Sequence, residues 1–596
     1  MKKLACSLLL GALVLSAQTP TNSDNDPLLR AMKDELKRSS ALTRLGLEQP
    51  YFMEYRADDV VSHGISASLG ALLQATDNAY RIPTVRVRVG NYNFDNTNHI
   101  YSAAYGGSRY DPDRLSLDSD YMSFRQVYWL ATDRAFKTAE DALARKRSSL
   151  KNMSLPDALP DFSKATPAQL ILPIQRKPVA MEAWKKEIVK ISGVFGAYPQ
   201  VLSSGVEMQI SQAMDYVVNT EGTALRVPED LTFVRLLAQG LAADGTAVHD
   251  AQVLQAFEAD ELPAEAELTR AAKEVGEHVA ALSQAPAGES YDGPVLFEAQ
   301  AAAQLFAQLL GDNLKLPRKP IADPGRAPGV ISSELENRVG SHIFPDWIDV
   351  VDDSTQTKSG GRTLLGHYVY DIEGVAPQLV TLVEKGVLKS FLLTRTPVFK
   401  DFPGSNGHAR FTGSFGDQAP GFGNLFIRAS QTTPAAAMKQ KLIDLCKQRN
   451  KPYGILIRKL DFPSAAPVDE VRRLMQASGG GHAVTGPLLV YRVYPDGREE
   501  LVRSVQFHGV STRSFKDIVA ASDENYVFDF VDSDAAFAHM GSGSFITTAS
   551  VIAPAVLFEE LELAPVQAET PEPPIVPPPP LSTQPVTTAA SATPGK

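Results

Sequence analysis

The segment GPVLFEAQAAAQLFAQLLGDNLKLPRK, residues 293 to 319, decides how the rest of the chain is interpreted. Its second part carries apolar side chains at helical spacing, namely Leu305, Phe306, Leu309 and Leu310. This spacing predicts a buried helix that ends at Gly311. Asp312 is the only side chain at the helix that could bind a metal or move a proton at neutral pH. The segment therefore predicts a helix with a packing role and without a catalytic role.

Composition places the chain among soluble globular proteins. Its 596 residues suggest more than one domain, and 44% hydrophobic with 21% charged residues is an ordinary balance. With 58 basic and 69 acidic residues the net charge is −11. Nucleic-acid-binding proteins usually carry a strongly basic surface, which this composition does not predict. Small molecules and polypeptides are the expected partners.

The first residues, MKKLACSLLLGALVLSAQTP, have the form of a secretory signal peptide. Two lysines precede an apolar run from Leu4 to Val14, and the small residues Ser16 and Ala17 follow it. The run is too short to span a bilayer as an anchor. We therefore expect a signal peptide over residues 1–17, a mature chain that begins near Gln18, and a periplasmic or secreted protein without a transmembrane anchor.

Cleavage at that site would leave one cysteine, Cys446, so that no intrachain disulfide could form. Cys446 lies in the helical pattern TTPAAAMKQKLIDLCKQRN, where Thr433 and Pro434 are expected as N-cap and first helical residue. Because free cysteines are usually buried, we expect a small apolar core residue here rather than a nucleophile or a ligand.

Local patterns predict an α+β protein with two main parts. Helical spacing marks residues 132–147 and 265–282, whereas TVRVRVGNY, DYVVNTEGTALRV and LTFVRLLAQGLAADGTAVH predict strands, the last two with turns at Gly222 and Gly245. Further on, hairpins are expected at Gly386 and Gly497. We expect a mixed α/β N-terminal and central region over residues 26–290 and a mainly antiparallel β C-terminal domain with a few helices over residues 293–563. The Pro-rich residues 564–596 are expected to be a disordered tail.

Known catalytic motifs are missing from the chain. The ten histidines include no pair at three- to five-residue spacing, and neither a Walker loop nor a G-x-S-x-G elbow occurs. Residues 478–486, SGGGHAVTG, could form an anion nest around His482, although a turn is the expected role. The cluster Asp529, Asp532, Asp534 and His539 lacks the glycine and glutamate of a calcium loop, and a solvated loop is expected.

Two acidic pairs could in principle serve a glycosidase. These pairs are Asp352 with Asp353, and Asp371 with Glu373. Each adjoins a strand end and a glycine or serine, where carboxylates usually accept hydrogen bonds from the backbone of a turn. Turn formation is therefore the expected role of both pairs.

The order of several segments resembles the TldD/PmbA family, also called TldD/TldE, of metallopeptidase-related proteins. The segments are YDGPVLFEAQAAAQLF, VVDDSTQTKSGGRTLLGHYVYDIEGVAPQLVTLVEKGVLKSFLLTR, GSNGHARF, GNLFI and ASVIAPAVLFEELEL. The resemblance extends from about Gly293 to Leu563 and continues more weakly toward the N-terminus. The first hundred residues match poorly.

The resemblance implies a zinc helix that this chain has lost. Metal-bearing members carry H-E-x-x-x-H after the GPVLFEAQAAAQLF-like segment, with two histidine ligands and a glutamate as general base. This chain has AQLLGD instead, with Ala307 and Asp312 at the histidine positions and Gln308 at the glutamate position. The family's third ligand, a cysteine, would fall near AHMGSGSF, where only His539 and Met540 offer donor atoms. We therefore predict no catalytic residue, no metal ligand and no cofactor-binding residue.

Two main functions remain open. The family comprises paired subunits, one with the zinc helix and one, of TldE or PmbA type, without it. The first hypothesis is a zinc-free subunit that binds peptides and supports proteolysis with a metal-bearing partner, in a hetero- or homo-oligomer. The second is an active exported peptidase with a rebuilt metal site, for instance from His482, His508 or His539 with the acidic residues 529–534. A structural envelope protein is a third alternative.

Overall fold

The computed structural model describes most of the chain in a series of ranges. These are residues 25–41, 48–100, 109–110, 114–151, 159–322, 333–411, 418–462, 484–532 and 547–566. The predicted signal peptide, His482, Asp534, His539, Met540 and the tail beyond residue 566 lie outside them. In the described part, no helix has the length and hydropathy needed to cross a membrane.

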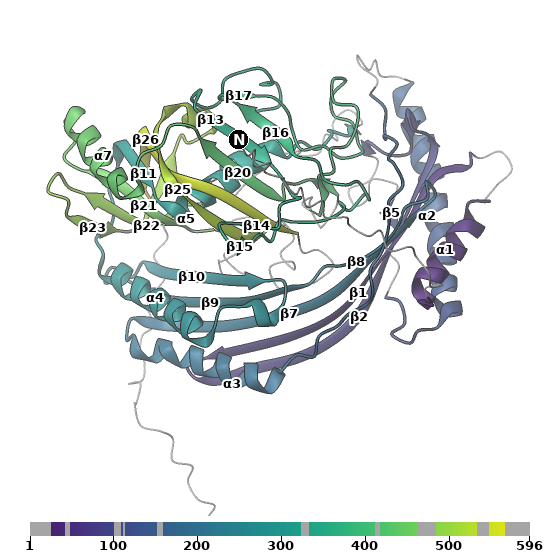
Figure 1. Cartoon of the computed structure of the whole chain (residues 1–596), viewed down its shortest axis with the longest axis horizontal. Coiled ribbons are helices and arrows are strands. Elements are labelled where there is room, and N and C mark those ends of the chain that lie inside the picture. Colours follow the sequence, from purple (N-terminus) through teal and green to yellow (C-terminus); the bar gives the residue numbers. More distant parts are fainter. Residues whose placement is uncertain are drawn as a thin grey trace, which may run out of the picture.

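The N-terminal half is built on a long, curved sheet (Figure 1). Its strands run in the order β10-β9-β7-β1-β2-β3, with β5 beside β2, β8 beside β7 and β6 beside β8. Their bounds are Pro50–Ser68 for β1, Ala71–Asn91 for β2, Phe94–Asp95 for β3, Arg109–Tyr110 for β5, Gln169–Ile171 for β6, Val201–Asn219 for β7, Ala224–Pro228 for β8, Leu231–Leu241 for β9 and Ala247–Ala256 for β10. Pairing is antiparallel except between β6 and β8.

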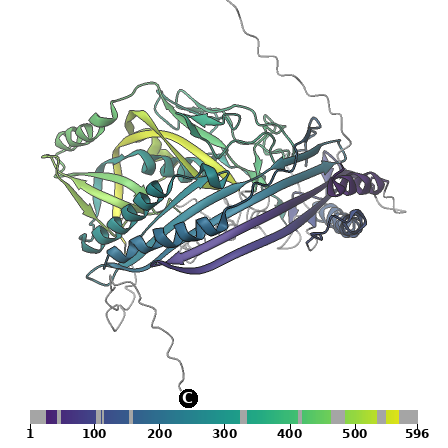
Figure 2. The same cartoon turned by 60° about the horizontal axis from the view of Figure 1, so that its bottom comes forward.

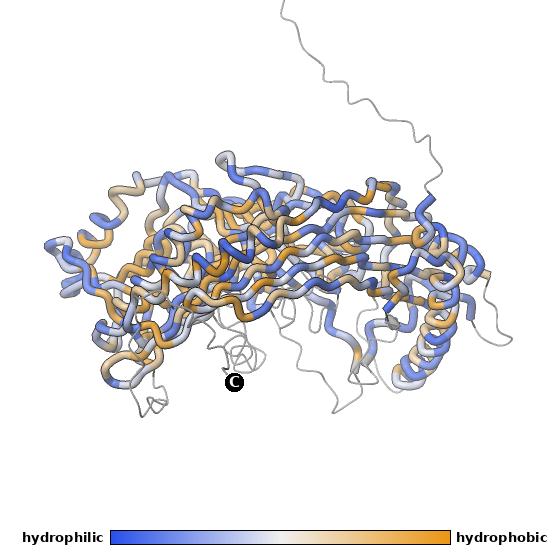
Figure 3. Tube along the Cα trace, turned by 90° about the horizontal axis from the view of Figure 1, so that it is seen from below, coloured by the Kyte–Doolittle hydropathy of each residue, from blue (hydrophilic) through white to orange (hydrophobic). Residues whose placement is uncertain are grey.

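Four helices cover one face of this sheet. They are α1 (Pro27–Ser39), α2 (Tyr121–Leu150), α3 (Met181–Ser192) and α4 (Glu265–Gln284). Apolar side chains of alternate strand residues meet α1 and α2 at one end of the sheet and α3 and α4 at the other. Figure 2 shows α3 and α4 lying along the strands. Figure 3 shows hydrophilic and hydrophobic residues alternating along the strands.

The opposite face of this sheet is polar and is turned toward the C-terminal half. Because successive side chains of a strand point to opposite faces, Met53, Tyr55 and Ala57 reach the helices while Glu54 and Arg56 point away. A guanidinium nitrogen of Arg56 donates a hydrogen bond to the backbone carbonyl of Ile372 in the C-terminal half. The two halves therefore meet across a layer of charged side chains.

The C-terminal half is a mixed, mainly antiparallel sheet around one long strand. Its order is β17-β16-β13-β20-β26-β11-β21-β22-β23, and β24 and β25 also pair with β26. The bounds are Tyr291–Phe297 for β11, Ile348–Asp352 for β13, Val380–Glu384 for β16, Val387–Leu388 for β17, Asn424–Ala429 for β20, Gly454–Leu460 for β21, Pro487–Val493 for β22, Glu499–Val502 for β23, Val505–His508 for β24, Ile518–Val531 for β25 and Thr548–Pro565 for β26. Two pairs, β11 with β21 and β20 with β26, are parallel. The predicted α+β class is confirmed.

Short two-stranded ladders complete the list of strands. They are β4 (His99–Ile100) with β12 (Ile321–Ala322), β14 (Lys358–Ser359) with β15 (Arg362–Thr363), and β18 (Ala409–Arg410) with β19 (Ala419–Pro420). The first of these pairs is parallel and joins the N-terminal half to the segment that follows the buried helix.

The helix of the opening segment is buried as predicted but does not end at Gly311. It runs as α5 (Ala299–Leu305), then as the π-helical segment η3 (Phe306–Gly311), and then as α6 (Asp312–Leu314). Gly311 keeps helical backbone angles, and a Cβ atom there would overlap the ring of Phe422. Glycine is thus required by close packing rather than by a helix end.

The cap predicted for α7 (Ala435–Gln448) was also wrong by one position. Pro434 is the N-cap residue, and the backbone N–H of Thr433 bonds to the carbonyl of Ala521 on β25. Asp523 accepts the hydrogen bond from the backbone N–H of Ala435, so the cap comes from a distant strand. Cys446 is buried in the core under α7, as predicted.

Candidate functional site

At the position where the family resemblance implies a general base, Gln308 bonds through its amide to the segment that precedes β22. The Nε2 of Gln308 donates to the hydroxyl oxygen of Thr485 at 3.0 Å, and the backbone N–H of Thr485 donates to its Oε1 at 2.8 Å. Gln308 is only 8% exposed. Since a neutral amide cannot accept a proton at neutral pH and both of its ends are bonded, Gln308 serves as a structural bridge.

The second histidine position carries a carboxylate that is paired with a lysine. Asp312 lies 2.8 Å from the ammonium of Lys315, and the same ammonium lies 2.6 Å from Asp532 at the end of β25. Burial raises the pKa of the Asp532 carboxyl group, while the charge of Lys315 opposes that rise. The positive charge beside Asp312 is thus that of Lys315.

These side chains do not fit a zinc ion. Alanine at position 307 has no donor atom, the amide of Gln308 is engaged with Thr485, and Asp312 faces Lys315. Zinc sites usually combine three or four converging nitrogen, sulfur or carboxylate donors. Within the described ranges, no three His, Cys, Asp or Glu side chains form a group that could hold a metal ion.

Among the described residues of the predicted alternative site, His508 lies far from Asp529. His508 on β24 pairs with Glu562 of β26, whereas Asp529 on β25 pairs with Ser550 of the same strand. Twelve residues separate Ser550 from Glu562, which is about 40 Å of extended strand. His508 is bonded to Glu562 at 2.7 Å, and Asp529 accepts a hydrogen bond from Ser550 at 2.6 Å. These two side chains cannot share one ion.

Asp352 and Asp353 hold local backbone, as the turn interpretation expects. Asp352 accepts hydrogen bonds from Ser354 and from the backbone of Gly423, and contacts the buried His408 at 2.8 Å. Asp353 accepts the backbone N–H and the hydroxyl of Thr355. A serine, an aspartate and a histidine thus meet, but the aspartate lies between the other two, so the histidine cannot activate the serine as in a catalytic triad.

The second acidic pair also serves the backbone. Asp371 accepts three backbone hydrogen bonds, from Glu373, Val375 and Ala409. Glu373 accepts one from the backbone N–H of Arg395 at 2.7 Å. Both carboxylates thus bond backbone N–H groups, some of them from distant segments, which gives the pair a structural role.

A third acidic group, which sequence reasoning missed, lies on the polar face of the N-terminal sheet. We call Asp58, Asp215 and Glu229 the inter-sheet cluster. Asp58 on β1 is directly opposite Asp215 on β7 in the strand register. Asp215 is 4% exposed and bonds Arg56 at 2.6 Å, whereas Asp58 is half-buried and Glu229 is exposed.

The three carboxyl groups of the cluster hold protons more tightly than isolated ones. Burial, followed by the charge of Asp215, raises the pKa of Asp58 and raises that of Glu229 to about 7. The pKa of Asp215 is raised by burial and lowered by Arg56, and a hydrogen bond links it to Asp58. Two carboxylates that face each other cannot both ionise easily, so the pair retains a proton above the usual range.

Arg410 connects the inter-sheet cluster electrostatically with the end of the buried helix. Its charge lowers the pKa of both Glu229 and Asp532. Its guanidinium donates to the carbonyl of Thr548 at 2.8 Å and stacks over the ring of Tyr368 at 4.3 Å. The same arginine thus acts on the polar face of the N-terminal sheet and on the region where the family's zinc helix would end.

No sequence motif predicts the inter-sheet cluster, because its members come from three separate strands or strand ends. The one available signal was the charged residues at alternate positions of YFMEYRADD, residues 51–59. A strand with Glu54, Arg56 and Asp58 on one face and apolar residues on the other indicates a buried polar layer.

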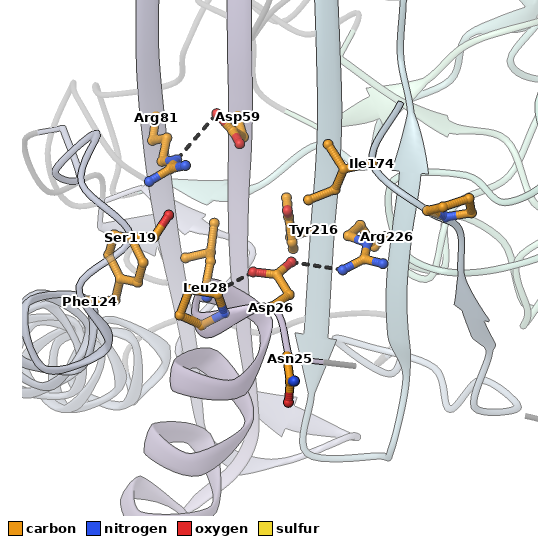
Figure 4. A pocket seen from close by; sticks show the side chains of 12 residues that line it. Asn25, Asp26, Leu28, Asp59, Arg81, Ser119, Phe124, Ile174, Tyr216 and Arg226 are labelled. Atoms are coloured by element: carbon orange, nitrogen blue, oxygen red, sulfur yellow. Dashed lines mark hydrogen bonds and ion pairs between the residues drawn. The ribbon is translucent and has the colours of Figure 1, made fainter. Parts of the chain in front are cut away.

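A separate pocket of about 390 Å³ lies on the helix-bearing face of the same sheet (Figure 4). Asp26, the N-cap of α1, lies 2.8 Å from Arg226, and Asp59 lies 3.2 Å from Arg81. Leu28 and Ile174 contribute apolar surface. Because its carboxylates and guanidinium groups are already paired, the pocket offers less unbalanced charge than the inter-sheet cluster.

Comparison with known proteins agrees with this architecture. The model of the PmbA/TldA metallopeptidase C-terminal domain matches residues 290–565. A metalloprotease of Methanothermobacter thermautotrophicus is 27% identical over 248 residues, which are 40% of this chain and 48% of that protein. This chain thus matches about half the length of that relative.

Solved structures share the fold across both halves. The crystal structure of TldE from Thermococcus kodakarensis has a TM-score of 0.56 at 14% identity, covering 90% of this chain and all of that chain. A candidate modulator of a DNA gyrase from Thermotoga maritima has a TM-score of 0.52 at 14% identity, covering 86% and 96%. Through residues 290–565, the chain thus carries the C-terminal domain of the PmbA/TldA family, and the solved structures show that its fold is shared over both halves.

Proposed function

We propose that this chain is a zinc-free member of the family that binds polypeptides and supports their hydrolysis by a metal-bearing partner subunit. The observation that carries the proposal is the set of contacts at the helix where the family resemblance implies a zinc site. Gln308 is bonded to Thr485 at both ends of its amide, and Asp312 is paired with Lys315. Both side chains are thus bonded within the chain.

Packing supports the same conclusion. The helix is enclosed by the C-terminal core, in which Phe306 stacks on Phe515 and Gly311 lies against Phe422. A segment that had lost its ligands without another role would be free to loosen, whereas this one is buried along its length. The helix therefore retains a role in the fold that does not require a metal.

Export is part of the proposal. The sequence pattern of residues 1–17 directs the protein to the periplasm or beyond, and polypeptides present there would be its substrates. N-terminal sequencing of the protein from a fractionated producing cell tests this part. A chain that begins near Gln18 in the envelope fraction is expected, and intact Met1 on cytoplasmic protein would contradict it.

The partner is tested by affinity purification from the envelope fraction, followed by mass spectrometry. We expect a relative that carries H-E-x-x-x-H, and we expect peptide hydrolysis by the mixture to exceed that of the partner alone. As a matched control, the bait carries Gln308→Ala and Thr485→Ala. These substitutions perturb the buried helix and leave the surface of the protein unchanged. Repeated recovery of the full chain without any such relative would contradict the partner role.

A further inference from the structure

The pocket on the helix-bearing face of the N-terminal sheet is lined by two ion pairs whose charges balance (Figure 4). Asp59 of β1 is directly opposite Arg81 of β2 in the strand register, and its Oδ1 lies 3.2 Å from the Nε of Arg81. Elsewhere in the lining, Asp26 lies 2.8 Å from Arg226 of β8. A charged ligand would leave one charge unpaired in this lining, so a neutral ligand fits better.

In the described part of the chain, Asp59 and Arg81 each keep an atom without a hydrogen-bond partner. Arg81 and Arg176 both contact the Oδ1 of Asp59, whereas no described residue donates to its Oδ2. The Nη1 of Arg81 donates to the carbonyls of Ser116 and Leu117, but its Nη2 has no acceptor among the described residues. The side chains of Asp59 and Arg81 are only 6% and 13% exposed, and both line the pocket. An open acceptor thus lies beside an open donor in a largely buried setting, where polar atoms are normally bonded.

Hydroxyl groups match such a pair of atoms, because a hydroxyl both donates and accepts hydrogen bonds. A simple cation or anion would satisfy only one of the two atoms. The lining adds hydroxyls of its own from Ser119 and Tyr216, and Ser119 forms no hydrogen bond to a described residue. A ligand with several hydroxyl groups would therefore find both donors and acceptors in the lining.

Apolar side chains complete the lining of the pocket. Leu28 and Ile174 both belong to it, and Ile174 is 44% exposed, so it offers apolar surface to a ligand. A saccharide ring has hydroxyl groups around its edge and a face of C–H groups. This combination is the one that the polar and apolar parts of the lining require.

We propose that this pocket binds a neutral saccharide of one or two rings. Adjacent ring hydroxyls donate to the Oδ2 of Asp59 and accept from the Nη2 of Arg81, while a C–H face of the ring packs on Leu28 and Ile174. The pocket volume of about 390 Å³ lies within the roughly 300–1,000 Å³ of small-molecule sites. Because the pocket is on the face of the sheet that is turned away from the C-terminal half, the inference goes beyond the proposed function and does not depend on it.

Saturation-transfer NMR of the full chain with single sugars tests the site. The panel consists of glucose, galactose, mannose, N-acetylglucosamine, maltose and cellobiose. The comparison compounds are cyclohexanol, which has one hydroxyl on an apolar ring, and N-methylacetamide, which has an amide. We expect at least one sugar of the panel to bind more tightly than both comparison compounds. Glucuronate and glucosamine, which carry a charge, should bind more weakly than that sugar.

Variants locate the sugar in the pocket. For the sugar that binds best, Asp59→Asn should raise the Kd about tenfold, because a charge-assisted hydrogen bond is lost. Ile174→Asp should also weaken binding, and its side chain is exposed, so the fold is preserved. The matched controls are Asp133→Asn, whose carboxylate pairs with Lys137 on the surface of α2, and Leu130→Asp at an exposed position of the same helix. Both controls should leave the Kd unchanged, and melting curves show that each variant is folded.

Binding that both pocket variants weaken and both controls retain would support the saccharide site. The absence of a signal from every sugar of the panel would overturn it. The proposal would also be wrong if cyclohexanol or N-methylacetamide bound as tightly as the best sugar, or if Asp59→Asn and Ile174→Asp both kept the Kd of the parent.

Discussion

Asp58 and Asp215 lie directly opposite each other in the antiparallel pair of β1 and β7, and a hydrogen bond links their carboxyl groups. Arg56, two residues before Asp58, bonds Asp215 and also the backbone of the C-terminal half. Arg56 therefore connects a pair of carboxyl groups that have raised pKa values with the backbone of the C-terminal half.

Stability should fall as pH rises through the neutral range. The folded-state pKa of Glu229 is raised to about 7, above its usual value of 4.5, so the folded chain binds more protons than the unfolded chain between these values. The resulting loss of stability grows across this window and is complete above it. Glu229→Gln should unfold at higher urea than the parent at pH 8, with little difference at pH 4. A variant that is weaker at pH 8 would contradict the assignment.

Lys315→Met should destabilise the C-terminal half, because it leaves Asp312 and the largely buried Asp532 without their shared ammonium. We expect a loss of about 2–4 kcal/mol in the free energy of unfolding. Lys319→Met is the matched control, since Lys319 pairs with Glu336 at the surface. Adding Asp532→Asn to Lys315→Met should recover part of the loss in urea denaturation, and no recovery would argue against charge as the cause.

Leu310→Asp should unfold the C-terminal half, because it puts an unpaired charge at a fully buried position. The expected cost is several kcal/mol, roughly the penalty for a buried unpaired carboxylate. The exposed Leu379 provides the control, and Leu379→Asp should change the melting temperature little. Similar melting temperatures for both variants would show that the helix of residues 299–314 is not part of the core.

Single steps back toward the family's zinc helix should fail. Neither Gln308→Glu nor Asp312→His supplies the set of converging donors that zinc requires, because position 307 is still alanine. Equilibrium dialysis against zinc should find no more metal on either variant than on the parent. One zinc ion bound per chain by a single variant would reveal donors outside the helix.

Cys446 should react with iodoacetamide only after unfolding. Its thiol is 1% exposed, and burial raises the pKa of that thiol to about 11. Mass spectrometry of the peptide that contains Cys446 should show alkylation in concentrated urea and none in native buffer. Rapid labelling of the native chain would mean that α7 opens readily.

Local patterns predicted the secondary structure best where each element has one apolar face. Helix α4 begins at Glu265 as expected, and the turns at Gly222, Gly245, Gly386 and Gly497 all have positive φ. The long hairpin of β1 and β2 was missed in large part. Its inner face carries buried charges such as Arg56 and Arg88. Arg56 bonds Ile372 of the C-terminal half, and Arg88 bonds Asp95 and Thr97, which follow the hairpin.

The residues of the candidate sites also differ in how far the sequence could predict them. Ala307, Gln308 and Asp312 could be assigned from the sequence because they occupy one short segment. The bonding partners Thr485 and Asp532 could not, since they come from residues far along the chain. Asp58, Asp215 and Glu229 meet only through the register of β1 and β7 and the turn after β8, which one sequence does not reveal.

The most direct measurement is casein hydrolysis by the full chain, purified without a partner, before and after treatment with a chelator and then with added zinc. A zinc-free subunit predicts no hydrolysis that responds to either treatment. Hydrolysis that the chelator abolishes and zinc restores would contradict the central claim and would place a working metal site elsewhere in this chain.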